Sequence, residues 1–152
     1  MPFERSAGAV VFCKGPQGPS SSAKATEDIE FLLLQYKRDG REWWDYVKGH
    51  REAGETEIET TLRELKEETG LTDVEVVPGF KTWIKFFFKE NGRTVAKIVD
   101  FYLVEAKTKE VKLSFEHAGY DWLSYEQALE RLMYKNAKEV LKKANNFLKR
   151  ET

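Results

Sequence analysis

One segment of the chain carries the signals of both ends of a helix. Residues 56–70 begin with Thr56, a favoured N-cap residue, and Glu59 follows three positions later, as in a capping box. The segment ends at Gly70, which suits the left-handed C-cap conformation. Runs of strand length, rich in β-branched and aromatic residues, lie before and after it. One capped interior helix among strand-forming runs restricts the chain to a mixed α/β fold.

Loop and turn signals separate the strand-forming runs. A Gly, Pro and Ser-rich loop is expected at 15–27, and Asn91-Gly92 is the strongest short-range signal of a β-hairpin. The period changes near the C-terminal end, where 124–151 predicts one or two amphipathic helices. The expected extended runs are 6–14, 28–37, 43–49, 74–90 and 93–107.

Length and composition predict one domain over residues 1–152, because 41% hydrophobic residues in a chain of this size supply one core. The net charge of -1 gives no general electrostatic reason to bind nucleic acid or a membrane, although a local basic patch can exist. No apolar run of about 18 residues is present. We therefore expect a cytoplasmic monomer without membrane or nucleic-acid partners. The single cysteine, Cys13, is expected to be a buried strand residue.

The helix at 56–70 is unusually acidic on one side. Its aliphatic side chains at Ile58, Leu62 and Leu65 are predicted to pack, whereas Glu64, Glu67 and Glu68 spread over the opposite side. Glutamates at this spacing repel one another, and those near the C-terminal end are also disfavoured by the helix dipole. Two explanations remain open from periodicity alone. The acids bind a hard divalent cation, or they form a solvated face with Arg63 and Lys66 as counterions.

The loop before the helix favours the first explanation. Nine positions fit the pattern G-x5-E-x7-R-E-U-x-E-E-x-G-U, where U is aliphatic, without a gap or substitution over residues 49–71. They are Gly49, Glu55, Arg63, Glu64, Leu65, Glu67, Glu68, Gly70 and Leu71. This pattern resembles the Nudix box, the signature of the Nudix hydrolase family.

The resemblance implies a Nudix-type α/β/α sandwich with a mixed central sheet, which cleaves a nucleoside diphosphate linked to another group with Mg2+ or Mn2+. Glu55 and Arg63 fall on positions of a structural ion pair that orients the helix. Glu64 is the first choice for the catalytic base and Glu116 the second. The metal-binding positions fall on Glu64, Glu67 and Glu68, on the carbonyl of Gly49, and on Glu116 from outside the helix.

Segments outside the box resemble one branch of the family, the asymmetric diadenosine tetraphosphate hydrolases of animals and archaea. They include "AGAVVF", "IEFLLLQ" and "LSFEHAGYDWLS". That resemblance implies attack of water on a dinucleoside tetraphosphate, releasing ATP and AMP. The implied substrate contacts are Lys48, His50, Phe86, Lys97, Tyr120 and Phe147, with the two phenylalanines on opposite faces of an adenine.

Several of these residues also have a purely structural explanation. Phe86 can be a sheet-face aromatic, Phe147 can belong to the apolar stripe of the last helix, and Phe87 is expected in the core. Trp43 and Trp44 form either a cleft wall or a buried corner, and the buried corner is favoured. Relatives commonly have proline where this chain has Val47, which makes substrate choice less secure than hydrolysis.

Two rival functions follow from the same motif. A pyrophosphatase could act on nucleoside triphosphates or on the 5′ phosphates of RNA, although the C-terminal lysines are better explained as the solvated face of a helix that also contains Glu139. An inactive Nudix domain that senses nucleotides would usually lack box glutamates, and here all are present.

Overall fold

The computed structural model describes residues 3–15 and 29–150 of the chain. Its strands are β1 (Phe3–Lys14), β2 (Ile29–Arg38), β3 (Arg41–Asp45), β4 (Val47–His50), β5 (Val74–Val76), β6 (Thr82–Glu90), β7 (Arg93–Ala106) and β8 (Gly119–Leu123). Its helices are α1 (Glu57–Thr69), α2 (Tyr125–Arg131) and α3 (Lys135–Arg150). The expected loop at 15–27 lies outside the described residues from position 16 onward.

The strands form one mixed sheet. Its main path runs β3-β2-β1-β7-β5, and β4, β6 and β8 pair with β1, β7 and β2 respectively. The pairing of β1 with β7 is parallel, whereas the other pairings are antiparallel. The run expected at 74–90 is divided by Pro78-Gly79 into β5 and β6, which both pair with β7.

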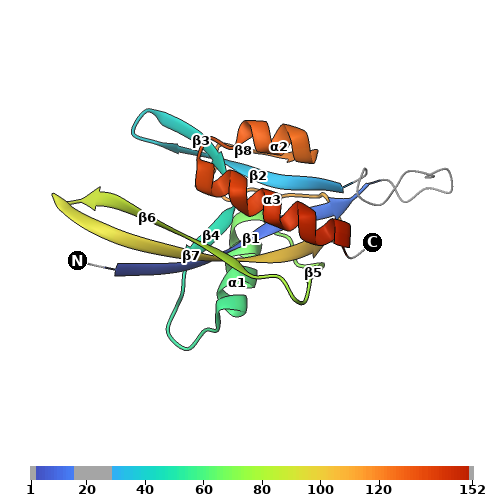
Figure 1. The fold of residues 1–152 in the computed structure, drawn as a ribbon, viewed down its shortest axis with the longest axis horizontal. Helices are drawn as coiled ribbons and strands as arrows, with labels where there is room; N and C mark the ends of the chain where they lie inside the picture. Colours follow the sequence, from blue (N-terminus) through green and yellow to red (C-terminus); the bar gives the residue numbers. More distant parts are fainter. Residues whose placement is uncertain (1–2, 16–28, 151–152) are drawn as a thin grey trace.

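Helices cover both faces of the sheet, as the expected α/β/α sandwich requires (Figure 1). One core lies between the sheet and α2 and α3, where Phe101 and Leu141 are fully buried. The other lies beneath α1 and includes Leu34 and Leu65. Cys13 is 6% exposed on β1, which confirms its prediction as a buried strand residue.

The turn and cap signals act as predicted. Asn91 and Gly92 have φ values of 51° and 77°, so that they form the tight turn between β6 and β7. In α1, Thr56 accepts a hydrogen bond from the Glu59 amide, and the Glu59 carboxylate accepts one from the Thr56 amide. Gly70 ends the helix at φ 76°.

The prediction of which side of α1 packs was only partly right. Leu65 is fully buried, as predicted, but Ile58 is 39% exposed and Glu68 is only 5% exposed. Three threonines take part in the buried face together with Leu65: Thr60, Thr61 and Thr69. Their hydroxyl groups bond within the helix or its preceding loop, which allows them to be buried. Glu68 therefore faces the sheet, whereas Glu67 faces the solvent.

The prediction that Phe87 belongs to the core was also wrong, because its side chain is 57% exposed. Along β6 the even-numbered residues are the more buried ones. No helix within the described residues is long and apolar enough to span a membrane.

Candidate active site

A cleft of about 780 Å³ lies where β4, the N-terminal end of β1 and α1 meet. Eight of the predicted site residues line it: Lys48, Gly49, His50, Arg63, Glu64, Glu68, Lys97 and Glu116. The structure thus gathers residues from positions 48 to 116 of the chain around one opening.

The two carboxylates that α1 directs into this cleft are Glu64 and Glu68. Burial, followed by the neighbouring Glu68 carboxylate, raises the pKa of Glu64 to about 7. Gly49 lies directly against Glu64, since a Cβ added to this glycine would lie closer than 3.0 Å to the Glu64 carboxyl carbon. The second carboxylate oxygen of Glu68 is buried and has no hydrogen-bond partner. The site therefore holds crowded, incompletely satisfied oxygen atoms.

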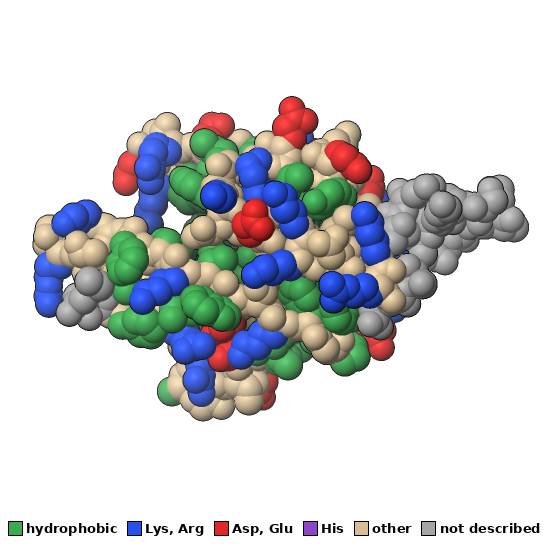
Figure 2. Space-filling model, viewed as in Figure 1, with side chains coloured by type: hydrophobic (Ala, Val, Ile, Leu, Met, Phe, Trp, Pro, Cys, Tyr) green, Lys and Arg blue, Asp and Glu red, His purple; other side chains and the backbone are tan. Residues whose placement is uncertain are grey.

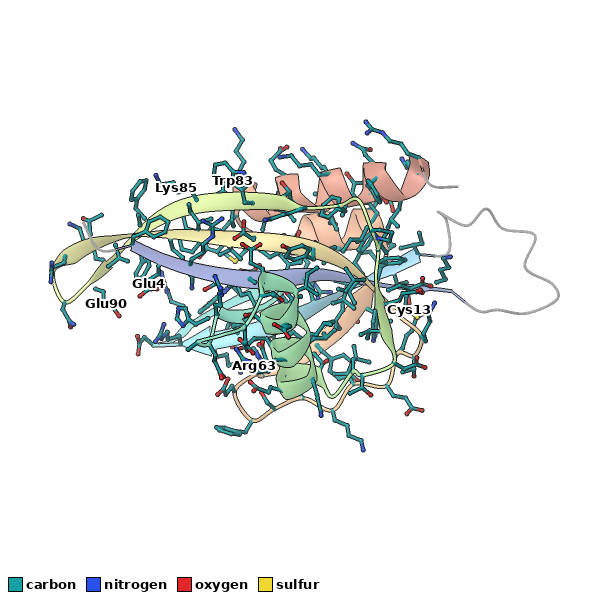
Figure 3. The ribbon with its side chains drawn as sticks, turned by 90° about the horizontal axis from the view of Figure 1, so that it is seen from below. Glu4, Cys13, Arg63, Trp83, Lys85 and Glu90 are labelled. Atoms are coloured by element: carbon teal, nitrogen blue, oxygen red, sulfur yellow. The ribbon has the colours of Figure 1, made fainter. Side chains whose placement is uncertain are left out.

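Arg63 connects the helix to the loop before it. Its Nε lies 2.6 Å from Oε2 of Glu55 and its Nη2 lies 3.1 Å from Oε1, so that the predicted ion pair is present and bidentate. The same Nη2 donates to the carbonyl of His50, and Nη1 contacts Glu64 at 3.0 Å and Glu67 at 3.2 Å. Figure 3 shows Arg63 projecting from α1. This guanidinium fixes α1 against the end of β4 and partly neutralises the acids.

His117 holds Glu68 from the opposite side. Its Nε2 lies 2.5 Å from Oε1 of Glu68, and its side chain is only 3% exposed. The Tyr36 ring packs edge-on against His117 at 4.7 Å, and Trp43 stacks on Tyr36 at 5.5 Å. All of these rings line the cleft.

Tyr36, Trp43 and His117 form one wall of the cleft. Sequence reasoning did not select these three residues together, because they lie on three separate segments. The signal for part of this wall was available in the Asp39-Gly40 turn, both of whose residues have positive φ. A two-residue hairpin turn at this position sets Tyr36 opposite Trp43. Trp43 is therefore a cleft residue, against the favoured interpretation, whereas Trp44 packs against the core with Arg131 over its ring.

Two lysines supply positive charge on the other side of the cleft. Burial, followed by repulsion from Lys48, lowers the pKa of Lys97. Lys48 is held by Asp45 at 3.0 Å, and its ammonium lies 5.7 Å from the centre of the Phe86 ring. Phe86 thus packs beside the lysines, and Val47, the residue that differs from the family pattern, is buried.

Other predicted site residues are more exposed than Glu64 and Glu68. Glu67 bonds to Arg63 and is largely exposed, Glu116 is exposed at the cleft rim, and His50 lies 3.4 Å from Glu4. Tyr120 is 41% exposed on β8 and is not among the residues that line the cleft.

The two phenylalanines predicted to enclose an adenine are not brought together. Phe147 packs against Phe80, with ring centres 5.6 Å apart. Asn136, at the other end of α3, donates to the carbonyl of Lys85, next to Phe86. Phe147 lies eleven positions after Asn136 in α3, which corresponds to roughly 16 Å along the helix. A base stacked on Phe86 would not touch Phe147 in this arrangement.

The oxygen donors fit a hard divalent cation. Glu64 and Glu68 lie side by side, one Glu68 oxygen is buried without a partner, and the backbone of Gly49 adjoins Glu64. Among the described residues, no three acidic or histidine side chains are already gathered as a complete metal site. Arg63 bridges two of the predicted metal-binding carboxylates, because its Nη1 contacts both Glu64 and Glu67.

The comparisons with known proteins agree with this geometry. The sequence pattern of the NUDIX domain matches residues 20–144. The chain belongs to the Nudix family. Nudix hydrolases generally use divalent metal cations, which is consistent with the oxygen donors of the cleft.

Relatives of this Nudix hydrolase point to a smaller group. The mouse (Mus musculus) bis(5′-nucleosyl)-tetraphosphatase [asymmetrical] is 37% identical over 124 residues, covering 79% of this chain and 81% of the relative. The structure of a C. elegans Ap4A hydrolase binary complex has a TM-score of 0.77 at 29% identity, covering 95% and 97% of the two chains. An RNA pyrophosphohydrolase of Sulfurovum is 27% identical over 139 residues, covering 84% and 87%.

Proposed function

We propose that this Nudix hydrolase cleaves diadenosine tetraphosphate asymmetrically, giving ATP and AMP, with Mg2+ as its preferred cation. The observation that carries the proposal is a cleft with two crowded pairs of like charges. Glu64 and Glu68 repel each other on one side, and Lys48 disfavours the charge of Lys97 on the other. A polyphosphate together with a divalent cation would relieve both repulsions.

The cation would be held by the carboxylates of Glu64 and Glu68 and by the carbonyl of Gly49, with Glu67 and Glu116 able to join from the rim. When bound, it supplies positive charge that screens the phosphate oxygens and lowers the pKa of water. Arg63 keeps α1 in register with the loop through Glu55 and the His50 carbonyl, so that the carboxylates need little reorganisation.

Proton transfer is assigned to Glu64, with Glu116 as the second candidate. The Glu64 carboxyl group lies inside the cleft, against the backbone of Gly49 and beside Glu68, where it can reach a water molecule at the phosphate chain. Glu64 is also partly covered by the protein, whereas Glu116 is exposed. Lys48 and Lys97 bind and orient the phosphate chain from the opposite wall.

The choice of a dinucleoside tetraphosphate is supported by the mouse and C. elegans relatives, which cover most of the chain. Phe86, beside Lys48, is the better placed of the two predicted adenine contacts. His50 and Tyr120 are proposed as more peripheral substrate contacts. We further propose that the chain acts as a single domain and as a monomer in the cytoplasm. The Sulfurovum relative makes an RNA 5′ end the second candidate substrate.

The deciding experiment is product analysis with Mg2+ and three substrates in parallel: diadenosine tetraphosphate, nucleoside triphosphates and 5′-triphosphorylated RNA. Equal amounts of ATP and AMP, formed faster than any other product, are expected. Two ADP molecules per substrate, or preferential turnover of a triphosphate or of RNA, would reject the proposed reaction. Absence of turnover with every substrate would instead indicate a nucleotide sensor.

A further inference from the structure

Three large aromatic side chains are exposed on one face of the sheet. Phe3 on β1 and Trp83 and Phe87 on β6 have 54%, 58% and 57% of their surface exposed. A single exposed aromatic needs no explanation, but a group of them on one surface marks an interaction site. None of the three lines the catalytic cleft.

The strand register places these side chains in adjacent rows. Residues paired directly across neighbouring strands project to the same face of a sheet. The rows across β1, β7 and β6 are Phe3, Ala96 and Phe87; Arg5, Ile98 and Lys85; and Ala7, Asp100 and Trp83. We call this surface the aromatic sheet face. Trp83 and Phe87 lie four residues apart along β6, or roughly 13 Å.

The aromatic sheet face lies on the α1 side of the sheet, beside the cleft. Ala7 pairs with Gly49, which lies against Glu64 of α1. Ser6 and Lys97 reach the cleft from the other face of β1 and β7. A ligand stacked on the three exposed aromatic side chains would therefore lie next to the catalytic cleft, on residues that do not line it.

The net positive charge of the aromatic sheet face comes from lysines of β6, because Arg5 is paired with Asp100 and lies near Glu57 of α1. Lys85 places its ammonium 5.5 Å from the centre of the Phe87 ring. The Arg5 side chain is 51% exposed, and that of Asp100 is 1% exposed. The two form an ion pair in which Nε of Arg5 lies 2.9 Å from Oδ2 of Asp100. Lys89 continues the same alternation along β6. In Figure 3, Trp83 and Lys85 project from β6 at the margin of the sheet.

The surroundings extend this positive character. Figure 2 shows Lys and Arg side chains, with hydrophobic side chains between them and few acidic ones, over the region of α3 and β6. A hollow of about 320 Å³ between β6 and α3 is lined by two lysines and one acid, together with Trp83: Lys85, Lys143 and Glu139. The local charge thus differs from the net charge of -1 of the whole chain.

We propose that the aromatic sheet face binds single-stranded nucleic acid, with unpaired bases stacked on Phe3, Trp83 and Phe87. Exposed aromatics on an open sheet are a common platform for unpaired bases, and lysine or arginine between them contacts the phosphates. A second copy of the chain is a poorer occupant, because pairing this face with itself brings Arg5 and Lys85 near like charges. The proposal does not depend on which nucleotide the cleft hydrolyses.

The test is fluorescence anisotropy with a 3′-labelled RNA of about ten nucleotides that carries a 5′ hydroxyl, so that it lacks a terminal phosphate for the cleft. We expect the intact chain to bind this RNA and Trp83→Ala/Phe87→Ala to weaken binding by about tenfold for each lost stack. Tyr134→Ala is the matched control, because it removes an aromatic that is 51% exposed between α2 and α3. Thermal midpoints would confirm that all variants are folded.

A charge variant tests the second part of the surface. Lys85→Gln is expected to weaken RNA binding and to reduce the slope of log Kd against log salt concentration by about one, as the loss of one phosphate contact requires. Lys112→Gln, in the loop after β7, is expected to leave both the affinity and the slope unchanged. The proposal is overturned if the intact chain does not bind the RNA, or if the aromatic double variant binds as tightly as Tyr134→Ala. It is equally overturned if phosphatidylserine vesicles or a second copy of the chain occupy this face while RNA does not.

Discussion

At the residue scale, Gly49 matters because it has no side chain. Its backbone lies against the Glu64 carboxyl group, and a Cβ at this position would overlap that group. We expect Gly49→Ala to displace Glu64 and lower kcat by at least about tenfold, which corresponds to a loss of about 1.4 kcal/mol of transition-state stabilisation. Steady-state kinetics and Mn2+ binding by calorimetry would measure both consequences.

The control for Gly49→Ala is Gly119→Ala. A Cβ at Gly119 meets the flexible amide end of Gln35 at 3.1 Å, which can move at little cost. Gly119→Ala should therefore keep its activity. Normal kinetics and metal affinity in Gly49→Ala would show that Glu64 can shift without consequence, and its assignment as the catalytic base would then be wrong.

Glu55 gives a prediction for pH. The bidentate bond to Arg63, and then the backbone amide of Glu52, lower the pKa of Glu55 from 4.5 to about 2. A folded-state pKa below the unfolded one stabilises the fold above about pH 4.5, and this contribution is lost as the pH falls toward 2. Glu55→Gln should be less stable than the unaltered chain at neutral pH, and the difference should shrink over this interval.

Urea unfolding midpoints of both proteins at a series of pH values would measure that difference. Glu126→Gln, in the first turn of α2, controls for the removal of a carboxylate outside the Arg63 network. A difference in stability that stays constant down to about pH 2 would be incompatible with the lowered pKa of Glu55.

At the element scale, the capping box of α1 sets the position of the helix that carries the acids. Thr56→Ala removes one of the two reciprocal bonds and should lower stability by about 1 kcal/mol. We expect kcat to fall as well, since Thr56 directly follows Glu55, the loop residue that Arg63 binds. Thr60, in the first turn of the helix, bonds to both Glu55 and Thr56. Thermal denaturation and kinetics on the same preparations would separate the two effects.

The chain contains a matched cap far from the chemistry. Ser124 and Gln127 form the same capping box at the start of α2. Ser124→Ala should cost similar stability without changing kcat. Equal effects of Ser124→Ala and Thr56→Ala on kcat would mean that the α1 cap contributes to general stability only.

The elements whose signals are local were the ones that sequence alone could predict. Thr56, Gly70 and Asn91-Gly92 act through hydrogen bonds and φ angles within a few residues, so that their effect is independent of the rest of the fold. The Nudix box likewise gave the carboxylates and the Glu55–Arg63 pair because its positions are contiguous.

Features set by tertiary packing could not be predicted in the same way. Which side of α1 meets the sheet depends on buried threonines, and their internal hydrogen bonds are not visible in a hydrophobic pattern. Phe87 resembles a core residue in sequence but lies at the open side of β6. The contact of His117 with Glu68 joins residues 49 positions apart, and no periodicity predicts it.

At the scale of the whole molecule, both faces of the sheet contribute to the cleft. Alternation along β1 and β7 directs Ser6 and Lys97 to the face that α3 covers, and Arg5 and Ile98 to the face that α1 covers. The cleft also depends on both cores. Its carboxylates come from α1, whereas Lys48 lies on β4, and the residue just before β4 packs in the core beneath α3.

That residue is Tyr46, which connects the layers directly. Its side chain is fully buried, its hydroxyl donates to the Ala137 carbonyl at 2.5 Å, and its own carbonyl accepts from the Tyr36 hydroxyl at 2.6 Å. Tyr46→Phe removes the first bond and should lower stability by about 1 kcal/mol. Hydrogen exchange should increase at the start of α3, while kcat is retained because Tyr36 keeps its acceptor.

Tyr102→Phe separates this effect from the general loss of a tyrosine hydroxyl. Tyr102 donates to Glu57 at 2.6 Å on the α1 side of the sheet, so its removal should leave exchange in α3 unchanged. Equal exchange in α3 for both variants would show that Tyr46 does not anchor this helix. Increased exchange confined to Tyr46→Phe, with normal kcat, would show that α3 can loosen without disturbing the catalytic face, because β4 is also held to β1 by its own strand pairing.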